Sequence, residues 1–301
     1  MKEFLINLMP GFMIRTFARP YVSGDSIDKG IEKTDSLWEE SKISATLDLL
    51  GEAVTTREMV EYNIETYHEL LDKLEGRSHA SVSLKPTSLG VHESVEYCEE
   101  SMRKILDKAK AVNIPITIDM EDHEYTDLTL DLYKTLLEDY PDLGTVLQSR
   151  LYRTEKDIEG LSSYTARIRI CIGIYNEPED IALQQKPEMK EKLVEYTQRL
   201  INDGHYVEVA THDKPTIDRV LQLADEHGWT SDQLEFQQLL GVPMRDKQEE
   251  ILSKGYTDRL YVPFATDWKY AVPYLKRRLN NNPRMALYVM SHTIGKLFGR
   301  H

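Results

Sequence analysis

Cysteine is scarce in this chain, and so are the motifs that would place it in several common classes of protein. Two cysteines among 301 residues, Cys98 and Cys171, are too few for a disulfide framework, and they indicate a reducing compartment. Neither belongs to a CxxC motif or a Cys/His cluster. The acidic stretch DHEYTD, which begins at Asp122, lacks the helical two-histidine spacing of zinc enzymes, so we expect no metal site. The chain also has no GxSxG elbow and no Walker-type phosphate loop.

Long apolar runs and an excess of positive charge are absent too. The opening segment MKEFLINLMPGFMIRTFARP is interrupted by Pro10, Gly11 and Arg15 well short of about 20 apolar residues, so we predict neither a spanning helix nor a signal peptide. A net charge of −14 argues against a polyanion-binding surface, so we expect no nucleic-acid partner. We therefore expect a cytoplasmic protein whose amphipathic first helix packs on the body. Peripheral contact with the inner face of a membrane is the alternative.

The chain does contain a regular alternation of short apolar runs and longer amphipathic stretches. Runs rich in Val, Ile and Leu that are separated by helical spacing are typical of buried parallel strands with crossover helices. The predicted strands are Ala45–Gly51, Ala80–Pro86, Pro115–Met120, Gly144–Arg150, Ala166–Gly173, Tyr206–Asp213, Leu234–Gly241 and Arg259–Ala265. These eight units predict a (β/α)₈ TIM-type barrel over residues 45–301, with a C-terminal helix, preceded by a helical arm over residues 1–44. An open doubly wound sheet is the alternative, but no GxGxxG follows the first strand.

A polar or ionisable side chain lies near the end of almost every predicted strand. Because catalytic residues of such barrels lie at the carboxyl ends of the strands, these side chains form a candidate site. They are Lys85, Asp119, Gln148, Arg169, Tyr175, Thr211, His212, Asp213, Glu235, Gln237 and Tyr261, and Gly173 lies with Tyr175 at the exit of the fifth strand. Each has a structural alternative, such as a helix cap for Asp119 or a core histidine for His212, but their gathering at one rim favours a site. Asp119 and Glu235 could also form a glycosidase acid pair, which nothing else in the sequence supports.

Nine segments, taken in order, resemble the proline dehydrogenase family. They are TLDLLGE, SLKPTSLG, DMED, LQSRLYRT, RICIGIYNEP, VATHD, EFQQLLGVP, YVPFATDW and YLKRRL, and they span about Ala45 to Pro283. The length fits the monofunctional bacterial branch. The resemblance implies a distorted (β/α)₈ barrel with noncovalent FAD across its top. It also implies oxidation of L-proline to Δ1-pyrroline-5-carboxylate, the first step of proline catabolism, with electrons passing to a membrane quinone. A relative acting on another small secondary amine, or a noncatalytic carboxylate-binding module, are the alternatives.

The resemblance also implies roles for individual residues. Arg277 and Arg278, which taken alone could be a solvated helix face, match the pair that grips the proline carboxylate through arginine's planar fork. Lys85 matches the active-site lysine and Asp119 its partner acid, while Tyr261 and Tyr274 match tyrosines that shape the substrate pocket. We expect cofactor contacts from Gln148, Arg169, Gly173, Tyr175, Thr211, His212 and Glu235.

Three positions depart from the family pattern. Ile172 replaces the usual lysine, which removes a cation from a strand that lines the cofactor. Ile174 replaces an alanine beside the pocket and adds bulk there. Asn281 replaces a glutamate on the last helix.

Overall fold

The structure is a computed structural model that describes residues 20–51 and 54–281, with side chains up to residue 276. The amphipathic first helix expected in the opening segment lies almost wholly outside these residues. Within the described part of the chain, no helix is long and apolar enough to cross a membrane.

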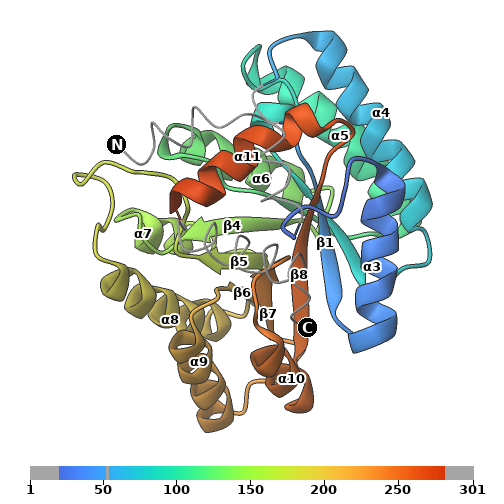
Figure 1. The fold of residues 1–301 in the computed structure, drawn as a ribbon. Helices are drawn as coiled ribbons and strands as arrows, with labels where there is room; N and C mark the ends of the chain where they lie inside the picture. The colour runs from blue at the N-terminus through green and yellow to red at the C-terminus, as the bar shows by residue number, and fades with distance from the viewer. Residues whose placement is uncertain (1–19, 52–53, 282–301) are drawn as a thin grey trace.

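Eight parallel strands form a closed barrel in which each strand pairs with its sequence neighbours and β8 pairs with β1 (Figure 1). The strands are β1 (Ser44–Leu49), β2 (Ala80–Leu84), β3 (Ile116–Ile118), β4 (Gly144–Gln148), β5 (Arg167–Cys171), β6 (Tyr206–Ala210), β7 (Leu234–Leu239) and β8 (Thr257–Phe264). All eight predicted strands are present, each within two residues of the predicted start. The (β/α)₈ prediction is therefore confirmed.

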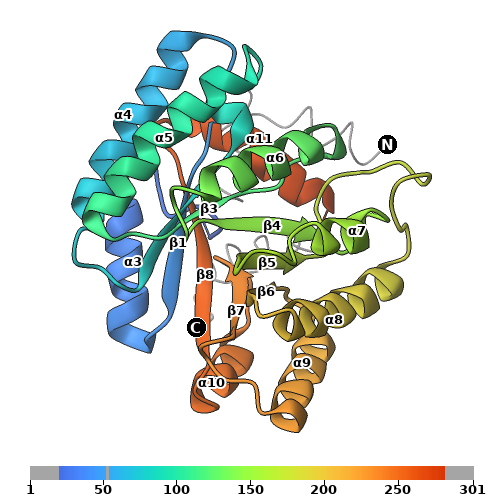
Figure 2. The same ribbon diagram turned by 180° about the vertical axis from the view of Figure 1, so that it is seen from behind.

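Helices alternate with the strands and surround the barrel (Figures 1 and 2). They are α4 (Arg57–Leu74), α5 (Val95–Val112), α6 (Thr126–Leu137), α7 (Thr154–Glu159), α8 (Lys186–Asn202), α9 (Lys214–His227), α10 (Arg245–Ser253) and α11 (Trp268–Asn281), with short 3₁₀ turns at Pro86–Ser88 and His123–Tyr125. Several begin at a side chain that caps the helix: Thr56, Ser94 and Asp213 each accept a hydrogen bond from the backbone N–H three residues later. Gly228 ends α9 with φ 70°, a left-handed conformation that glycine adopts at low cost.

The helix before the barrel, α3 (Ile27–Ser41), covers the seam between β1 and β8. Ile27 and Ile31 join the main core, and a Cβ added at Gly30 would lie 3.0 Å from Leu47 and 3.5 Å from Phe264, so the helix approaches the sheet closely. In a regular barrel the last helix occupies this seam. Here α11 instead crosses the end toward which the strands point (Figure 1), which is a distortion of the regular ring. The division into an arm and a barrel stays a prediction, and α3 itself shares the barrel's core.

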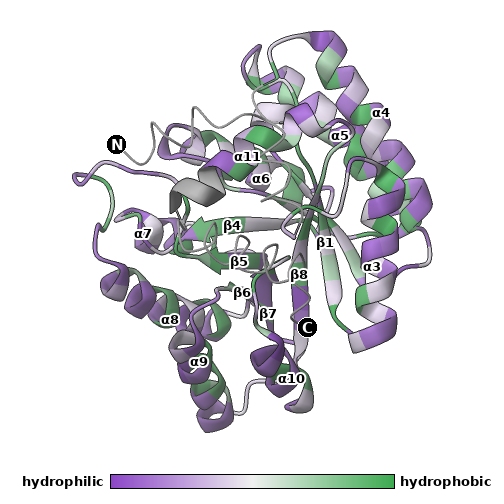
Figure 3. Cartoon of the chain, in the orientation of Figure 1, coloured by the Kyte–Doolittle hydropathy of each residue, from purple (hydrophilic) through white to green (hydrophobic). Residues whose placement is uncertain are grey.

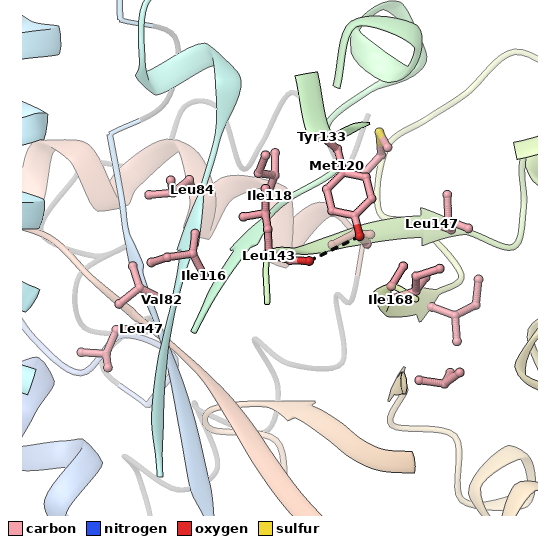
Figure 4. Packing of buried hydrophobic residues seen from close by; sticks show 14 of the residues in the cluster. Leu47, Val82, Leu84, Ile116, Ile118, Met120, Tyr133, Leu143, Leu147 and Ile168 are labelled. Atoms are coloured by element: carbon pink, nitrogen blue, oxygen red, sulfur yellow. Dashed lines mark hydrogen bonds between the residues drawn. The ribbon is translucent and has the colours of Figure 1, made fainter. Parts of the chain in front are cut away.

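The main core lies between the outer face of the barrel and the helices. Leu47, Val82, Ile118 and Ile168 are fully buried there, and Figure 4 shows them among neighbouring aliphatic side chains. The Tyr133 hydroxyl donates to the Leu143 carbonyl at 3.3 Å, so this buried polar group is satisfied.

Asp258 interrupts this apolar layer next to α10. It is fully buried, and its Oδ1 accepts a hydrogen bond from Gln238 Nε2 at 2.7 Å, while Oδ2 has no partner among the described residues. Burial raises the pKa of Asp258 from its ordinary 3.8 to about 7, and the hydrogen bond from Gln238 offsets only part of this. The folded state therefore holds a proton that the unfolded state releases between these two values.

Asp258→Asn should stabilise the fold at neutral pH. Because the pKa of Asp258 is raised in the folded state, its contribution to stability is present below pH 3.8 and is lost as the pH rises to about 7. The free energy of unfolding of the variant should exceed that of wild type by at most about 4 kcal/mol at about pH 8. This difference should shrink toward zero near about pH 4. Urea unfolding over this range measures the difference. Asp232→Asn, at an exposed aspartate, is the control; an equal gain for Asp258→Asn at both pH values would contradict the argument.

Candidate active site

The barrel interior contains ionic side chains where the interior of a regular barrel is filled mainly with branched apolar ones. Figure 3 shows hydrophilic residues along β7 and the lower part of β8. Toward the amino-terminal ends of the strands, Arg259 donates to both oxygens of Glu235, at 2.7 and 3.2 Å, and the Tyr206 hydroxyl donates to the same carboxylate at 3.1 Å. One level higher, Glu208 pairs with Arg167 and lies 3.4 Å from Arg169 Nε. Ion pairs thus continue upward to the carboxyl ends of the strands.

Asp119 is the centre of the uppermost level. Its Oδ1 accepts hydrogen bonds from Ser83 Oγ at 3.0 Å and Arg169 Nη1 at 2.7 Å. Its Oδ2 accepts from the Tyr261 hydroxyl at 2.5 Å and lies 3.3 Å from Lys85 Nζ. Lys85 donates to the Tyr261 oxygen at 3.1 Å, and it also pairs with Asp48 of β1. Lys85, Asp119, Arg169 and Tyr261, all predicted site residues, therefore meet in one buried cluster.

The charges in this cluster are held in fixed states. Burial alone would raise the pKa of Asp119, but the charges of Lys85 and Arg169 lower it below its ordinary value, so the carboxylate stays ionised. Burial, with the nearby Asp119 carboxylate, raises the pKa of Tyr261 well above its usual range, so its hydroxyl remains a donor. The Arg169 guanidinium lies 5.4 Å from the centre of the Tyr261 ring, a cation–π distance.

A second group of predicted residues lies at the rim beyond β4 and β5. Gln148 Nε2 donates to the Glu121 carbonyl at 2.9 Å, while its Oε1 is buried without a partner among the described residues. The Glu121 carboxylate is fixed by the Thr87 backbone N–H at 3.0 Å and by its hydroxyl at 2.5 Å, so the amide of Gln148 has a defined orientation. Gly173 has φ 90°, and a Cβ there would lie 2.2 Å from Gln148 Oε1, so only glycine leaves that oxygen uncovered.

The remaining predicted residues are more widely distributed. His212 Nε2 accepts a hydrogen bond from the Leu239 N–H at 2.8 Å, and Thr211 Oγ1 accepts from Asp213 N at 3.1 Å, so both brace the ends of β6 and β7. Tyr274 of α11 is buried in a hydrophobic cluster with Tyr21 and Leu50.

Glu235 lies near the start of β7, well below the strand ends, with its carboxylate bound by Arg259 and Tyr206. Its cofactor role stays a prediction. The helix of Arg277, Arg278 and Asn281 is described, but their side chains lie outside the described part of the structure.

Three residues of the site were not singled out from the sequence. Asp48 occupies an inward position at the end of β1 and pairs with Lys85. Glu208 is an acid in the middle of an otherwise apolar strand, and Arg150 follows Gln148 by two residues. The signal that could have found the first two is the two-residue alternation of a strand, since an ionisable residue at an inward position of a closed barrel must find a partner.

A closed barrel with buried ionic side chains at the carboxyl ends of its strands defines the class of (β/α)₈-barrel enzymes whose chemistry takes place at that face. In the described ranges, no group of three or more His, Cys, Asp or Glu side chains could hold a metal ion. The chain belongs to the proline dehydrogenase family, whose sequence model, described as "Proline dehydrogenase", matches residues 31–289.

Curated relatives agree with this membership, and a solved structure agrees with the fold. The chain is 37% identical to proline dehydrogenase 2 of Bacillus subtilis over 93% of this chain and 91% of that protein. It is 33% identical to proline dehydrogenase of Deinococcus radiodurans over 91% and 88% of the two chains. The crystal structure of proline utilization A from Bdellovibrio bacteriovorus matches 88% of this chain with a TM-score of 0.80 and 21% identity, which supports the fold. This chain spans 32% of that longer protein.

Glu208→Gln should destabilise the fold strongly. Burial would raise the pKa of Glu208, but Arg167, Arg169 and Arg259 lower it from its ordinary 4.5 to about 2, so the variant leaves buried cations without their counter-charge. Removing one partner of a buried ion pair costs about 3–5 kcal/mol. The stabilising effect of Glu208 is present above pH 4.5 and is lost as the pH falls toward about 2.

Urea unfolding at about pH 7 and about pH 3 measures this loss, which should be much smaller at the lower value. Glu226→Gln is the control, because Glu226 makes only half-exposed or exposed contacts among the described residues, an ion pair with Arg219 at 3.9 Å and a hydrogen bond from Gln222 at 2.6 Å. This variant should lower the free energy of unfolding by less than about 1 kcal/mol. If Glu208→Gln unfolded at the same urea concentration as wild type at neutral pH, the ionic interior would have no role in stability.

Proposed function

We propose that this protein oxidises L-proline to Δ1-pyrroline-5-carboxylate with noncovalently bound FAD. Family membership supports oxidation of proline as the reaction. The observation that carries the cofactor assignment is a set of buried polar atoms without partners at the strand ends, namely Gln148 Oε1 and Arg169 Nη2. Buried polar atoms in native proteins are nearly always hydrogen-bonded, so such atoms are explained by a ligand that satisfies them.

The residues present fit a flavin. Gln148 offers an oriented acceptor, Arg169 offers a donor that Asp119 holds in place, and Gly173 has no side chain that would cover the Gln148 oxygen. Tyr175, Thr211 and His212 follow β5 and β6 on the same side of the barrel and are proposed to border the cofactor. FAD, when bound, would accept the hydride from the ring carbon next to the proline nitrogen.

The chain's own side chains would bind and orient the substrate. Arg277 and Arg278 on α11 are proposed to clamp the carboxylate, since a paired guanidinium matches its two oxygens. Lys85 and the ionised Asp119 form a charged floor beneath, and the protonated Tyr261 between them limits the shape of the pocket. Tyr274, buried on α11, would close it from above. Fixed charges of this kind orient a zwitterion without reorganising during the reaction.

Electrons would leave to a quinone acceptor, which brings the protein into contact with the membrane surface where such acceptors are found. This part of the proposal rests on family membership alone. The same membership supports a protein made in the cytoplasm that meets the inner face of the membrane peripherally.

The purified protein should contain or take up FAD, and L-proline should bleach its visible absorbance under anaerobic conditions. A quinone analogue should then restore the absorbance, with Δ1-pyrroline-5-carboxylate trapped as its o-aminobenzaldehyde adduct. A protein that takes up no FAD would refute the cofactor assignment. A flavoprotein that proline does not reduce, but another small secondary amine does, would refute the substrate.

Arg278→Met should raise KM for proline about 10- to 100-fold with a smaller effect on kcat. The reason is that a carboxylate losing half its clamp forfeits a charge-assisted hydrogen bond of about 1.5–3 kcal/mol. Arg245→Met is the matched control, because Arg245 is exposed on α10 and pairs only with Glu249 among the described residues. Steady-state kinetics at saturating FAD measures KM and kcat for the two variants. An unchanged KM would show that Arg278 belongs to a solvated helix face.

A further inference from the structure

Arg150 is a buried cation at the rim that none of the predicted roles uses. Its side chain is 9% exposed, and no Asp or Glu in the described residues forms an ion pair with it. Its Nη1 donates to the Tyr175 carbonyl, whereas its Nε is buried with no hydrogen-bond partner in the described part of the chain. The carboxylate whose charge acts on it, Glu177, is already bound to His123 through the His123 N–H at 3.1 Å and its ring Nδ1 at 2.6 Å. A buried guanidinium without a paired carboxylate needs a ligand to balance it.

The backbone holds Arg150 rigidly. The Leu183 N–H donates to the Arg150 carbonyl at 2.8 Å, and Leu151 forms an antiparallel bridge with Ala182. The loop after β4 is thus fastened to the loop that leads from β5 to α8. The position of Arg150 is therefore set by the fold and does not depend on a long flexible loop.

Arg150 and Gln148 meet at the same glycine. A Cβ added at Gly173 would lie 2.2 Å from Gln148 Oε1 and 2.8 Å from Arg150 Cδ, the carbon bonded to Nε. An acceptor and a donor, both buried and both without partners in the described residues, thus lie beside the position that a Cβ of residue 173 would occupy. A phosphate would offer acceptors only and would be repelled by Gln148 Oε1. An imide edge, in which carbonyl oxygens flank an N–H, complements this pair.

We infer that Arg150 binds the pyrimidine edge of the isoalloxazine and supplies positive charge there, with Gln148 Oε1 accepting from the ring N–H. This assignment rests on the proposed function, because it requires a flavin at the rim. It also accounts for Ile172, which lies where the family has a lysine and packs here against the hydrophobic core. The cation expected from β5 is provided instead by the strand beside it, two residues beyond Gln148.

The experiment compares Arg150→Met and Arg150→Lys with Arg153→Met, a matched loss of one charge three residues away on the outer surface. Two quantities are measured on the full chain: the Kd for FAD from flavin fluorescence, and the Kd for sulfite with FAD saturating. Sulfite adds reversibly to the flavin N5 and leaves negative charge on the pyrimidine ring, so its affinity reports a nearby cation. Thermal unfolding without FAD checks that each variant is folded.

Arg150→Met should raise the Kd for FAD about 10- to 100-fold, the range of a charge-assisted hydrogen bond, and weaken sulfite binding by at least about tenfold. Arg150→Lys keeps the positive charge but loses the planar guanidinium. It should therefore raise the Kd for FAD while the Kd for sulfite stays within about threefold of wild type. Arg153→Met should match wild type in both measurements.

Three results would overturn the assignment. If Arg150→Met matched Arg153→Met in both measurements, Arg150 would serve only the loop that it packs against. If Arg150→Met weakened FAD binding but left sulfite binding unchanged, Arg150 would contact another part of the cofactor. If the wild-type protein itself took up no FAD, the proposed function would fail, and this assignment with it.

Discussion

The carboxylate of Asp119 joins four strands, and the candidate site depends on it. It accepts hydrogen bonds from Ser83 of β2, Arg169 of β5 and Tyr261 of β8, and it lies against Lys85. Ser83, Arg169 and Lys85 are buried and Tyr261 is partly buried, so water has little access to these hydrogen bonds, and loss of one partner leaves the others unsatisfied. This constraint fixes the side chains on the floor of the pocket before any ligand arrives.

Such an interior is stable only if its charges balance. Among the described residues, the ionic side chains inside the barrel are Asp48, Asp119, Glu208 and Glu235, matched by Lys85, Arg167, Arg169 and Arg259. Four negative charges meet four positive ones, and neutrality keeps the desolvation cost of each pair from accumulating into a net buried charge. The apolar contribution to stability comes instead from the layer between strands and helices, where Leu47, Val82 and Ile168 pack.

At the carboxyl ends of the strands, several buried polar atoms are not paired within the described part of the chain. Gln148, Arg150 and Arg169 each present at least one buried polar atom that has no partner among the described residues. Unpaired polar groups that gather at the rim favour a ligand there, because their desolvation cost is recovered on binding. The placement of α3 on the β1–β8 seam serves the same end, since it leaves α11 to cross the strand ends above the site.

The sequence by itself determined the elements and their order, because apolar runs with a period of two and amphipathic stretches with a period of 3.6 are local properties of the chain. It also placed Lys85, Asp119, Arg169 and Tyr261 near one rim, since parallel strands end on one side. It could not reveal that Asp48 and Glu208 complete the charge balance, or that Glu235 lies at the lower end of the interior. Nor could it show that the side chains of Arg150 and Gln148 both lie beside Gly173. These depend on strand register and on which side chains meet across a closed barrel, and only the tertiary structure decides that.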